Sequence, residues 1–195
     1  MKLKKEFEKI GKKLKKHIKV LITDGTQPIG NGIGPALEAR DIIWLLKRDS
    51  RKPIDLENKC LMMCAKIFGM IGLKDGYKKT SEILNSGKAY RKMIEIVKAQ
   101  GGKEITASGI KIGKHSFDVL SAKSGRVAAI DNIFISRIAR IAGAPRHKGA
   151  GIYLYKHVND KVKRGERLFT IYAEDKHDLE YAKDVAKSSK VFVVR

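Results

Sequence analysis

The sequence has little cysteine and no long apolar run: two cysteines occur in 195 residues. No stretch approaches the roughly 18 apolar residues that a membrane-spanning helix needs. The N-terminus also lacks the apolar core of a secretory signal. Two cysteines and no signal favour a cytoplasmic protein with no membrane partner.

Groups that carry out catalysis or bind metals are equally sparse. The five histidines are scattered and show no ligand spacing, and no carboxylate pair, catalytic triad or metal cluster stands out. We therefore predict no catalytic residue and no cofactor. The basic residues are not interleaved with an aromatic-rich RNA-binding signature, which argues against nucleic acid as the partner.

Acidic residues are outnumbered two to one, 21 against 42 basic residues, so the formal charge is +21. Such a charge fits a nucleic-acid surface, attraction of phosphate-bearing substrates, or simply solvated lysines. With 43% hydrophobic residues the chain can form one large domain or two small ones.

The N-terminal half is predicted to be mainly helical. Lysines and apolar residues alternate at helical spacing over residues 1–16, which predicts an amphipathic helix, docked on this domain rather than on a membrane. Cys60 and Cys64 lie four apart on a predicted helix and are expected to pack in the core. The remaining predicted elements are a buried strand at 18–24 and helices at 35–48, 56–70, 76–85 (capped by Asp75) and 88–100.

After Gly101-Gly102 the pattern changes to short strands, so we place a domain boundary there, giving units 1–101 and 102–195. The second unit should contain a helix at 131–141 and another at 178–186. Its predicted strands lie near 105–112, 117–120, 168–173 and 191–194, and a turn at 124–127 leads into another strand. The apolar residues Ile152, Leu154 and Val158 lead to a turn at 163–166.

A glycine-rich turn joins the first predicted strand to its helix. Gly25, Gly30, Gly32 and Gly34 precede Pro35, which suits a first helical turn. This arrangement fits either a tight connection, which we favour, or a turn that binds an anion at the helix N-terminus. The turn lacks the Gly-Lys-Ser/Thr ending of a phosphate loop.

The sequence of that turn, TDGTQPIG followed by IGPALEARD, closely resembles the pyrimidine-nucleoside phosphorylase family, especially its archaeal branch of thymidine phosphorylase-like and AMP phosphorylases. Three further segments resemble the family in the same order: CLMMCAKIFG, NSGKAYRKMIEIVKAQ and GAGIYLYKHVNDKVKRGERLFTIYAE. The resemblance implies a remnant of the family's α/β domain followed by an α/β hammerhead domain. A barrel-sandwich β element is expected at the turn around Asp160 and Gly165.

The family is a pentosyltransferase that uses phosphate as co-substrate to cleave an N-glycosidic bond into a base and a sugar phosphate. Its phosphate-binding Lys-x-Ser segment, base-binding helix and helical dimerisation domain precede the region matched here. The resemblance therefore implies a C-terminal subunit, a fragment, or a descendant with a new use. The first of these would need a separate N-terminal phosphorylase polypeptide and would form an oligomer, with a nucleoside or nucleoside monophosphate as substrate. The alternative is a stand-alone basic module that binds anions or nucleic acid.

Three polar residues of the turn could touch such a cleft: Asp24, Thr26 and Gln27. For Asp24 and Thr26 we favour hydrogen bonds to the turn's own amides. By resemblance to bacterial family members, a monovalent cation would be held by the carbonyls of Ile29 and Gly32 and the carboxylate of Asp41. That aspartate replaces a family glutamate.

Lys114-His115-Ser116 repeats the family's phosphate-binding tripeptide, but Phe117-Asp118-Val119 follows instead of Thr-Gly-Gly. We therefore interpret residues 114–116 as a loop without a phosphate role.

Overall fold

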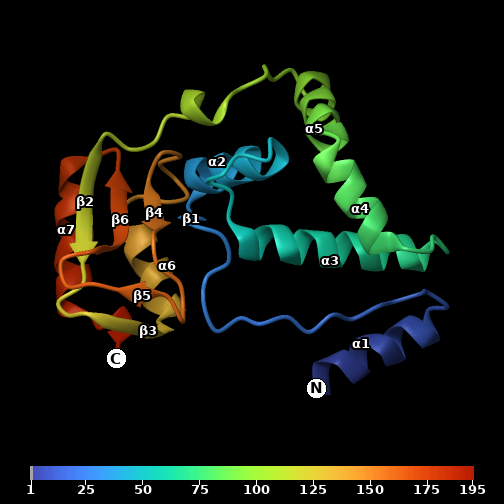
Figure 1. Cartoon of the computed structure of the whole chain (residues 1–195), viewed down its shortest axis with the longest axis horizontal. Helices are drawn as coiled ribbons and strands as arrows, with labels where there is room; N and C mark the ends of the chain where they lie inside the picture. Colours follow the sequence, from blue (N-terminus) through green and yellow to red (C-terminus); the bar gives the residue numbers. More distant parts are fainter. Residues whose placement is uncertain (1) are drawn as a thin grey trace.

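The computed structural model describes residues 2–195 and shows a compact β-rich body joined to a looser group of helices (Figure 1). The helices are α1 (Lys2–Lys13), α2 (Pro35–Leu46), α3 (Ile54–Met70), α4 (Gly76–Asn85), α5 (Lys88–Ala99), η1 (Ala107–Gly109), α6 (Asn132–Ile141) and α7 (Lys176–Ser188). The strands are β1 (Gly32–Ile33), β2 (His115–Leu120), β3 (Gly125–Ile130), β4 (Gly151–Leu154), β5 (Lys161–Val162), β6 (Arg167–Ala173) and β7 (Phe192–Val194).

The strands form two antiparallel sheets. One has the order β1-β4-β6-β2 and the other the order β5-β3-β7. The fold is thus mixed α and β with antiparallel sheets, whereas the hammerhead and barrel-sandwich descriptions stay predictions. Alternation places Phe117 and Val119 of β2 on the core side and leaves Asp118 exposed, as expected for a sheet with one covered face.

The main core lies in the β-rich body. Helices α6 and α7 contribute Ile135, Ile138 and Ala182, which are buried against strand residues such as Phe169 and Ile171. Asp131 caps α6 by accepting the amide protons of Ile133 and Phe134 at 2.9 and 3.0 Å. The predicted helices and strands of this half are found within a few residues. The exception is 105–112, which forms only the short helix η1.

The helical half has a far smaller core. One cluster of buried apolar residues joins α2, α3 and α4, through Leu45, Leu61 and Leu84. The predicted helices α2, α3, α4 and α5 are present. Asp75, however, does not cap α4 through its side chain, because it takes a left-handed backbone conformation (φ 55°).

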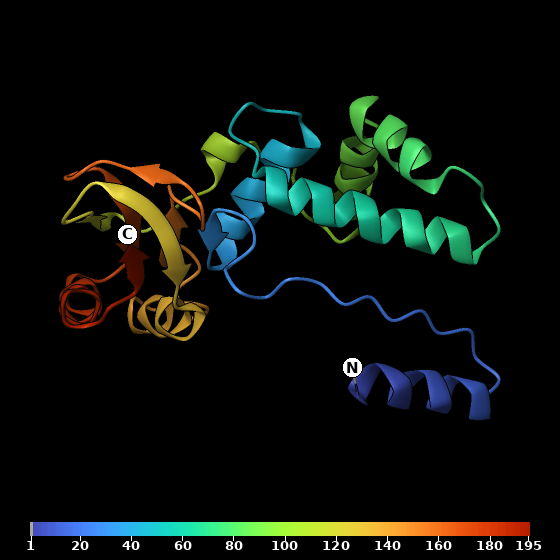
Figure 2. The same ribbon diagram turned by 60° about the horizontal axis from the view of Figure 1, so that its bottom comes forward.

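Two further expectations for this half are wrong. Residues 18–24 form no strand but run extended and mostly exposed, with Ile22 66% exposed. A strand needs a neighbouring strand for its backbone groups, and none of the described residues supplies one. Helix α1 forms as predicted but does not dock: Figure 2 shows it standing apart, and Leu3, Phe7 and Ile10 are exposed.

The cysteines are also placed differently from the prediction. Cys60 and Cys64 share one face of α3, but both are exposed beside Met63 and Ile67. Their helical spacing was interpreted correctly, whereas the side of the helix that would be covered was not. Within the described residues, the apolar face of α3 has too little chain around it to be buried.

The two halves meet at the glycine turn. β1 pairs with β4 through Gly32↔Tyr153 and Ile33↔Ile152, so residues of the helical half form an edge of the larger sheet. The boundary at Gly101-Gly102 stays a prediction.

Candidate functional site: the glycine turn and its adjoining cavity

Carboxylates of the chain itself accept hydrogen bonds from the backbone amides of the glycine turn. Asp41 Oδ2 accepts the amide protons of Asn31 and Gly32, each at 2.7 Å. Asp55 accepts that of Gly30 at 3.0 Å, and Glu38 accepts that of Gly34 at 3.0 Å. These amides are the groups that would otherwise hold an anion. The geometry therefore matches the tight connection that the spacing favoured, with internal carboxylates in the place of a phosphate.

Asp41 is the centre of this arrangement. Its side chain is buried, and the residue is 1% exposed. Burial raises the pKa of Asp41 above 3.8, and the amides of Gly32 and Asn31 only partly offset that effect. Its second oxygen, Oδ1, has no hydrogen-bond partner among the described residues.

The three residues of the suggested cation site lie in different surroundings. Ile29 is 38% exposed and lines a cavity, while Gly32 and Asp41 are buried and joined by the amide hydrogen bond. No group of three histidine, cysteine, aspartate or glutamate side chains suited to a metal occurs in residues 2–195. The cation site stays a prediction.

A cavity of about 350 Å³ lies between residues 22–29 and the start of α3. Two of the three predicted substrate-binding residues, Asp24 and Gln27, line it, whereas Thr26 does not. Helix α3 adds Asp55, Lys59 and the apolar Met62. The cavity thus combines a positive charge, carboxylates and an apolar wall, which suits a small polar ligand.

Local hydrogen bonds engage the predicted residues. Asp24 Oδ1 accepts the amide proton of Thr26 at 2.9 Å, and this bond lowers the pKa of Asp24. Gln27 Oε1 accepts the amide proton of Val158 at 2.7 Å, which ties the turn to the β-rich body. Their role in substrate binding stays a prediction.

An aromatic and arginine cluster beside the turn was not predicted. The guanidinium of Arg40 lies 4.7 Å from the ring centre of Trp44 and 4.8 Å from that of Tyr153. The side-chain amide of Asn31 donates to the Tyr153 hydroxyl at 3.3 Å, and the side-chain oxygen Oδ1 of Asn31 lies 2.9 Å from His157 Nε2. The i, i+4 spacing of Arg40 and Trp44 was the one available signal, but Tyr153 and His157 join only through the fold.

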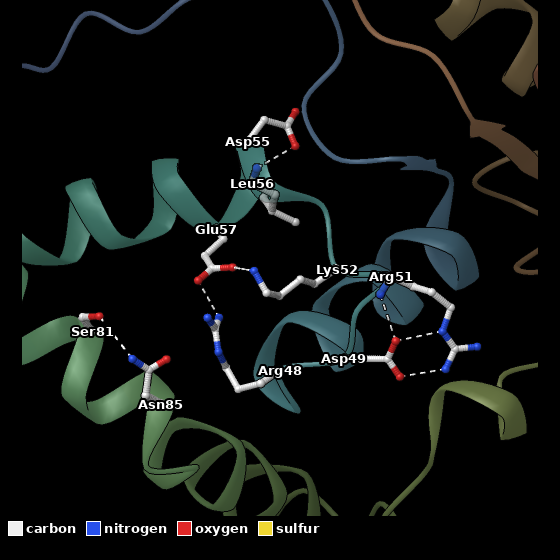
Figure 3. Close-up of polar contacts among 9 residues, drawn as sticks. All are labelled: Arg48, Asp49, Arg51, Lys52, Asp55, Leu56, Glu57, Ser81 and Asn85. Carbon is white, nitrogen blue, oxygen red and sulfur yellow. Dashed lines mark hydrogen bonds and ion pairs between the residues drawn. The ribbon is translucent and has the colours of Figure 1, made fainter. Parts of the chain in front are cut away.

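An ion network fixes the connection between α2 and α3 (Figure 3). Glu57 is buried and accepts from Arg48 and Lys52, and Arg51 makes a bidentate contact with Asp49 at 2.8 and 2.7 Å. The Arg51 side chain holds the pKa of Asp49 at about 2. These contacts set the direction of α3 and thereby place Asp55 and Lys59 at the cavity.

The Lys114-His115-Ser116 tripeptide is not a loop throughout. His115 and Ser116 begin β2, where they pair with Ala173 and Tyr172 of β6. The strand extends two residues further back than its apolar alternation indicated.

Residues 126–192, which run from β3 into β7, match the family model of the pyrimidine nucleoside phosphorylase C-terminal domain. This segment is therefore similar to that family. No helix among residues 2–195 is long and apolar enough to cross a membrane.

Several proteins are similar to this chain over nearly its whole length. Proteins of Bradyrhizobium diazoefficiens and Rhodopseudomonas palustris are each 40% identical over 100% of this chain and 38% of their own length. One of Methylococcus capsulatus is 38% identical over 96% of this chain and 36% of its own length. All three are named "Putative thymidine phosphorylase".

The chain therefore spans well under half the length of these bacterial relatives. This likeness to part of longer proteins does not favour the alternative of a stand-alone anion- or nucleic-acid-binding module.

Proposed function

We propose that the chain is the C-terminal subunit or fragment of a nucleoside or nucleotide phosphorylase. It would complete a substrate cleft against a separate N-terminal phosphorylase polypeptide. That polypeptide would supply the phosphate- and base-binding groups, and the pair would cleave an N-glycosidic bond with phosphate as co-substrate. The observation that carries this proposal is the uncovered apolar surface of the helical half.

The uncovered surface has two parts. Helix α3 exposes Met63 and Ile67, and the extended segment 18–24 exposes Leu21 and Ile22. Apolar surface of this extent commonly marks an interface. The extended segment also has backbone groups free for a neighbouring strand, so a polypeptide that brings sheet and apolar surface would satisfy both parts.

The cavity supports the same proposal. Ile22 and Asp24 of the uncovered segment lie on its wall, together with Gln27 and Lys59. A partner that covers Leu21 and Ile22 would close this cavity from the open side and exclude water from it. In this arrangement the chain contributes substrate contacts, and a monovalent cation at Ile29, Gly32 and Asp41 would brace the turn.

Several finer features belong to the proposal. The likeness of TDGTQPIG to the archaeal AMP phosphorylase branch supports a nucleoside monophosphate over a nucleoside as substrate. The family relationship further supports an α/β hammerhead with a barrel-sandwich element, a cytoplasmic location and an oligomeric enzyme.

The test is reconstitution. The full chain is mixed with an N-terminal phosphorylase polypeptide that carries the Lys-x-Ser segment, and base release is followed with and without phosphate. We expect the pair to associate and release base only with phosphate, faster from a nucleoside monophosphate than from the nucleoside. Absence of both association and activity gain would overturn the proposal.

A matched pair of variants locates the interface. Ile22→Lys places a charge on the uncovered segment, whereas Ile133→Lys makes the same change at a 79% exposed position of α6. Ile22→Lys should weaken association at least tenfold and Ile133→Lys should leave it within twofold. Equal effects would contradict the proposed interface.

A further inference from the structure

A second, larger cavity, termed the groove, lies in the β-rich body between the two sheets. Its volume is about 860 Å³, and residues 117–123 and 189–195 line it from opposite sides. These segments contain β2, an end strand of the four-stranded sheet, and β7, an end strand of the three-stranded sheet.

Both strands have one edge without a pairing strand among residues 2–195. β2 pairs with β6 alone and β7 with β3 alone. Each free edge carries backbone N–H and C=O groups that remain available to an extended chain. Residues of both strands line the groove, so an extended chain that lies along it could pair with these edges, whereas an apolar small molecule or an acyl chain could not.

The floor of the groove is apolar. Phe117 and Val119 of β2 and Val194 of β7 are half-buried there. Phe192 stacks on the fully buried Phe169 with ring centres 5.7 Å apart. Side chains that alternate along an inserted strand would meet this floor at every second position.

The rim of the groove is basic. Lys187 lies 5.5 Å from the Phe117 ring centre, and Lys123, Lys190 and Arg195 also line the groove. Asp118 is the one acidic residue of the lining. A strand with carboxylates at its outward positions is therefore favoured over a neutral or basic one.

We propose that this groove binds an extended acidic peptide segment of another protein, which adds as a strand between β2 and β7. Apolar side chains of the segment occupy the floor, and its carboxylates face the lysine rim. The inference is independent of the phosphorylase activity, since none of the residues of the glycine turn or its cavity takes part.

The first test uses the unaltered full chain and a fluorescent heptapeptide that alternates glutamate and valine. Binding is measured by fluorescence anisotropy. A lysine–valine peptide tests the charge, and a glutamate–valine peptide with every second amide N-methylated tests the backbone pairing. The unmodified acidic peptide should bind at least tenfold more tightly than either. No binding, or equal binding of the N-methylated peptide, would overturn the proposal.

The second test uses matched charge reversals. Lys187→Glu/Lys190→Glu changes the rim, and Lys78→Glu/Lys79→Glu makes the same change in net charge on the exposed surface of α4. The rim variant should lose at least tenfold in affinity and the α4 variant less than twofold. In the unaltered chain, the peptide should slow amide hydrogen exchange in 117–122 and 191–195. Equal losses in the two variants, or protection elsewhere only, would overturn the proposal.

Discussion

The carboxylate of Asp41 accepts the amide proton of Gly32 at 2.7 Å, nine residues before it in the chain. This contact joins helix α2 to the turn that precedes it and to strand β1. Because β1 pairs with β4, the same contact holds the helical half against the β-rich body. Asp41 is thus a structural carboxylate within the described chain, whatever further ligand its free oxygen meets.

Replacing Asp41 with alanine should destabilise the fold by about 2–6 kcal/mol, because one buried and one part-buried amide lose their acceptor at about 1–3 kcal/mol each. Urea unfolding measures the change. Asp24→Ala is the matched control, since Asp24 is exposed and should change stability by less than about 1 kcal/mol. Equal losses in the two variants would show that the Asp41 contacts do not hold the turn.

The same residue predicts a pH effect of unusual sign. Burial raises the pKa of Asp41 above 3.8 in the folded chain, against opposing effects of its amide partners and Arg40, while Asp55 raises it further. The folded state then binds the proton more tightly than the unfolded state. The contribution of Asp41 to stability is therefore present below pH 3.8 and is lost as the pH rises through the raised pKa.

The neutral variant Asp41→Asn is the reference for this effect. Unfolding free energies of the two proteins are compared between about pH 3 and about pH 7, the range in which carboxyl groups titrate. The unaltered chain should lose stability relative to Asp41→Asn as the pH rises. A relative gain would mean that the pKa of Asp41 is lowered in the folded chain.

Local signals predicted the β-rich half well. The helical spacing of apolar residues over 131–141 indicated α6, and the apolar residues of 117–120 indicated β2, because each pattern depends on residues nearby in sequence. The errors at 18–24, Cys60 and Cys64 have a common cause. There the sequence carries the apolar pattern of a buried strand and a buried helix face, but no described residue supplies the cover.

The candidate site was predictable only in part. The glycine turn revealed Asp24 and Gln27, which the structure places at one cavity. Lys59 and Asp55 reach the same cavity because the Glu57 network orients α3, and no spacing within the sequence encodes that approach. The capping of the turn by Asp41 and Asp55 was likewise hidden, since a carboxylate on a helix gives no local sign of the amides that it meets.

The close approach of β1 to β4 requires a glycine at position 151. Its φ is 152°, and a Cβ there would lie 2.1 Å from the carbonyl oxygen of Ile33. Gly151→Ala should therefore cost more than about 2 kcal/mol, through strain or loss of the pairing. Gly25→Ala is the control because a Cβ at Gly25 meets nothing within 4 Å. Thermal unfolding that shifts equally for both would contradict this requirement.

The Glu57 network should show the opposite pH dependence to Asp41. Burial raises the pKa of Glu57, but hydrogen bonds from Lys52 and Arg48 outweigh it and hold the pKa below 4.5. The stability it provides is present above pH 4.5 and lost as the pH falls through the lowered pKa. Glu57→Gln should cost about 2–4 kcal/mol at neutral pH, because two charge-assisted hydrogen bonds are weakened.

The exposed Lys92–Glu95 pair provides the control for Glu57. Glu95→Gln should change stability by less than about 1 kcal/mol at any pH, because exposed ion pairs contribute little. Unfolding free energies over the acid range distinguish the two variants. If Glu57→Gln retains the acid dependence of the unaltered chain, the network does not titrate with folding.

The cysteines offer a direct readout of the uncovered face of α3. Both thiols are exposed, so both should react with a maleimide in the folded chain. Burial raises the pKa of the Cys60 thiol, so Cys60 holds less thiolate than free cysteine in solution and should react more slowly than free cysteine does. Mass spectrometry of quenched time points, with Cys60→Ser and Cys64→Ser as references, gives both rates.

Addition of the N-terminal phosphorylase polypeptide should slow both reactions at least tenfold, because the proposed interface covers this face. Unchanged rates in a complex that has formed would place the interface elsewhere on the chain.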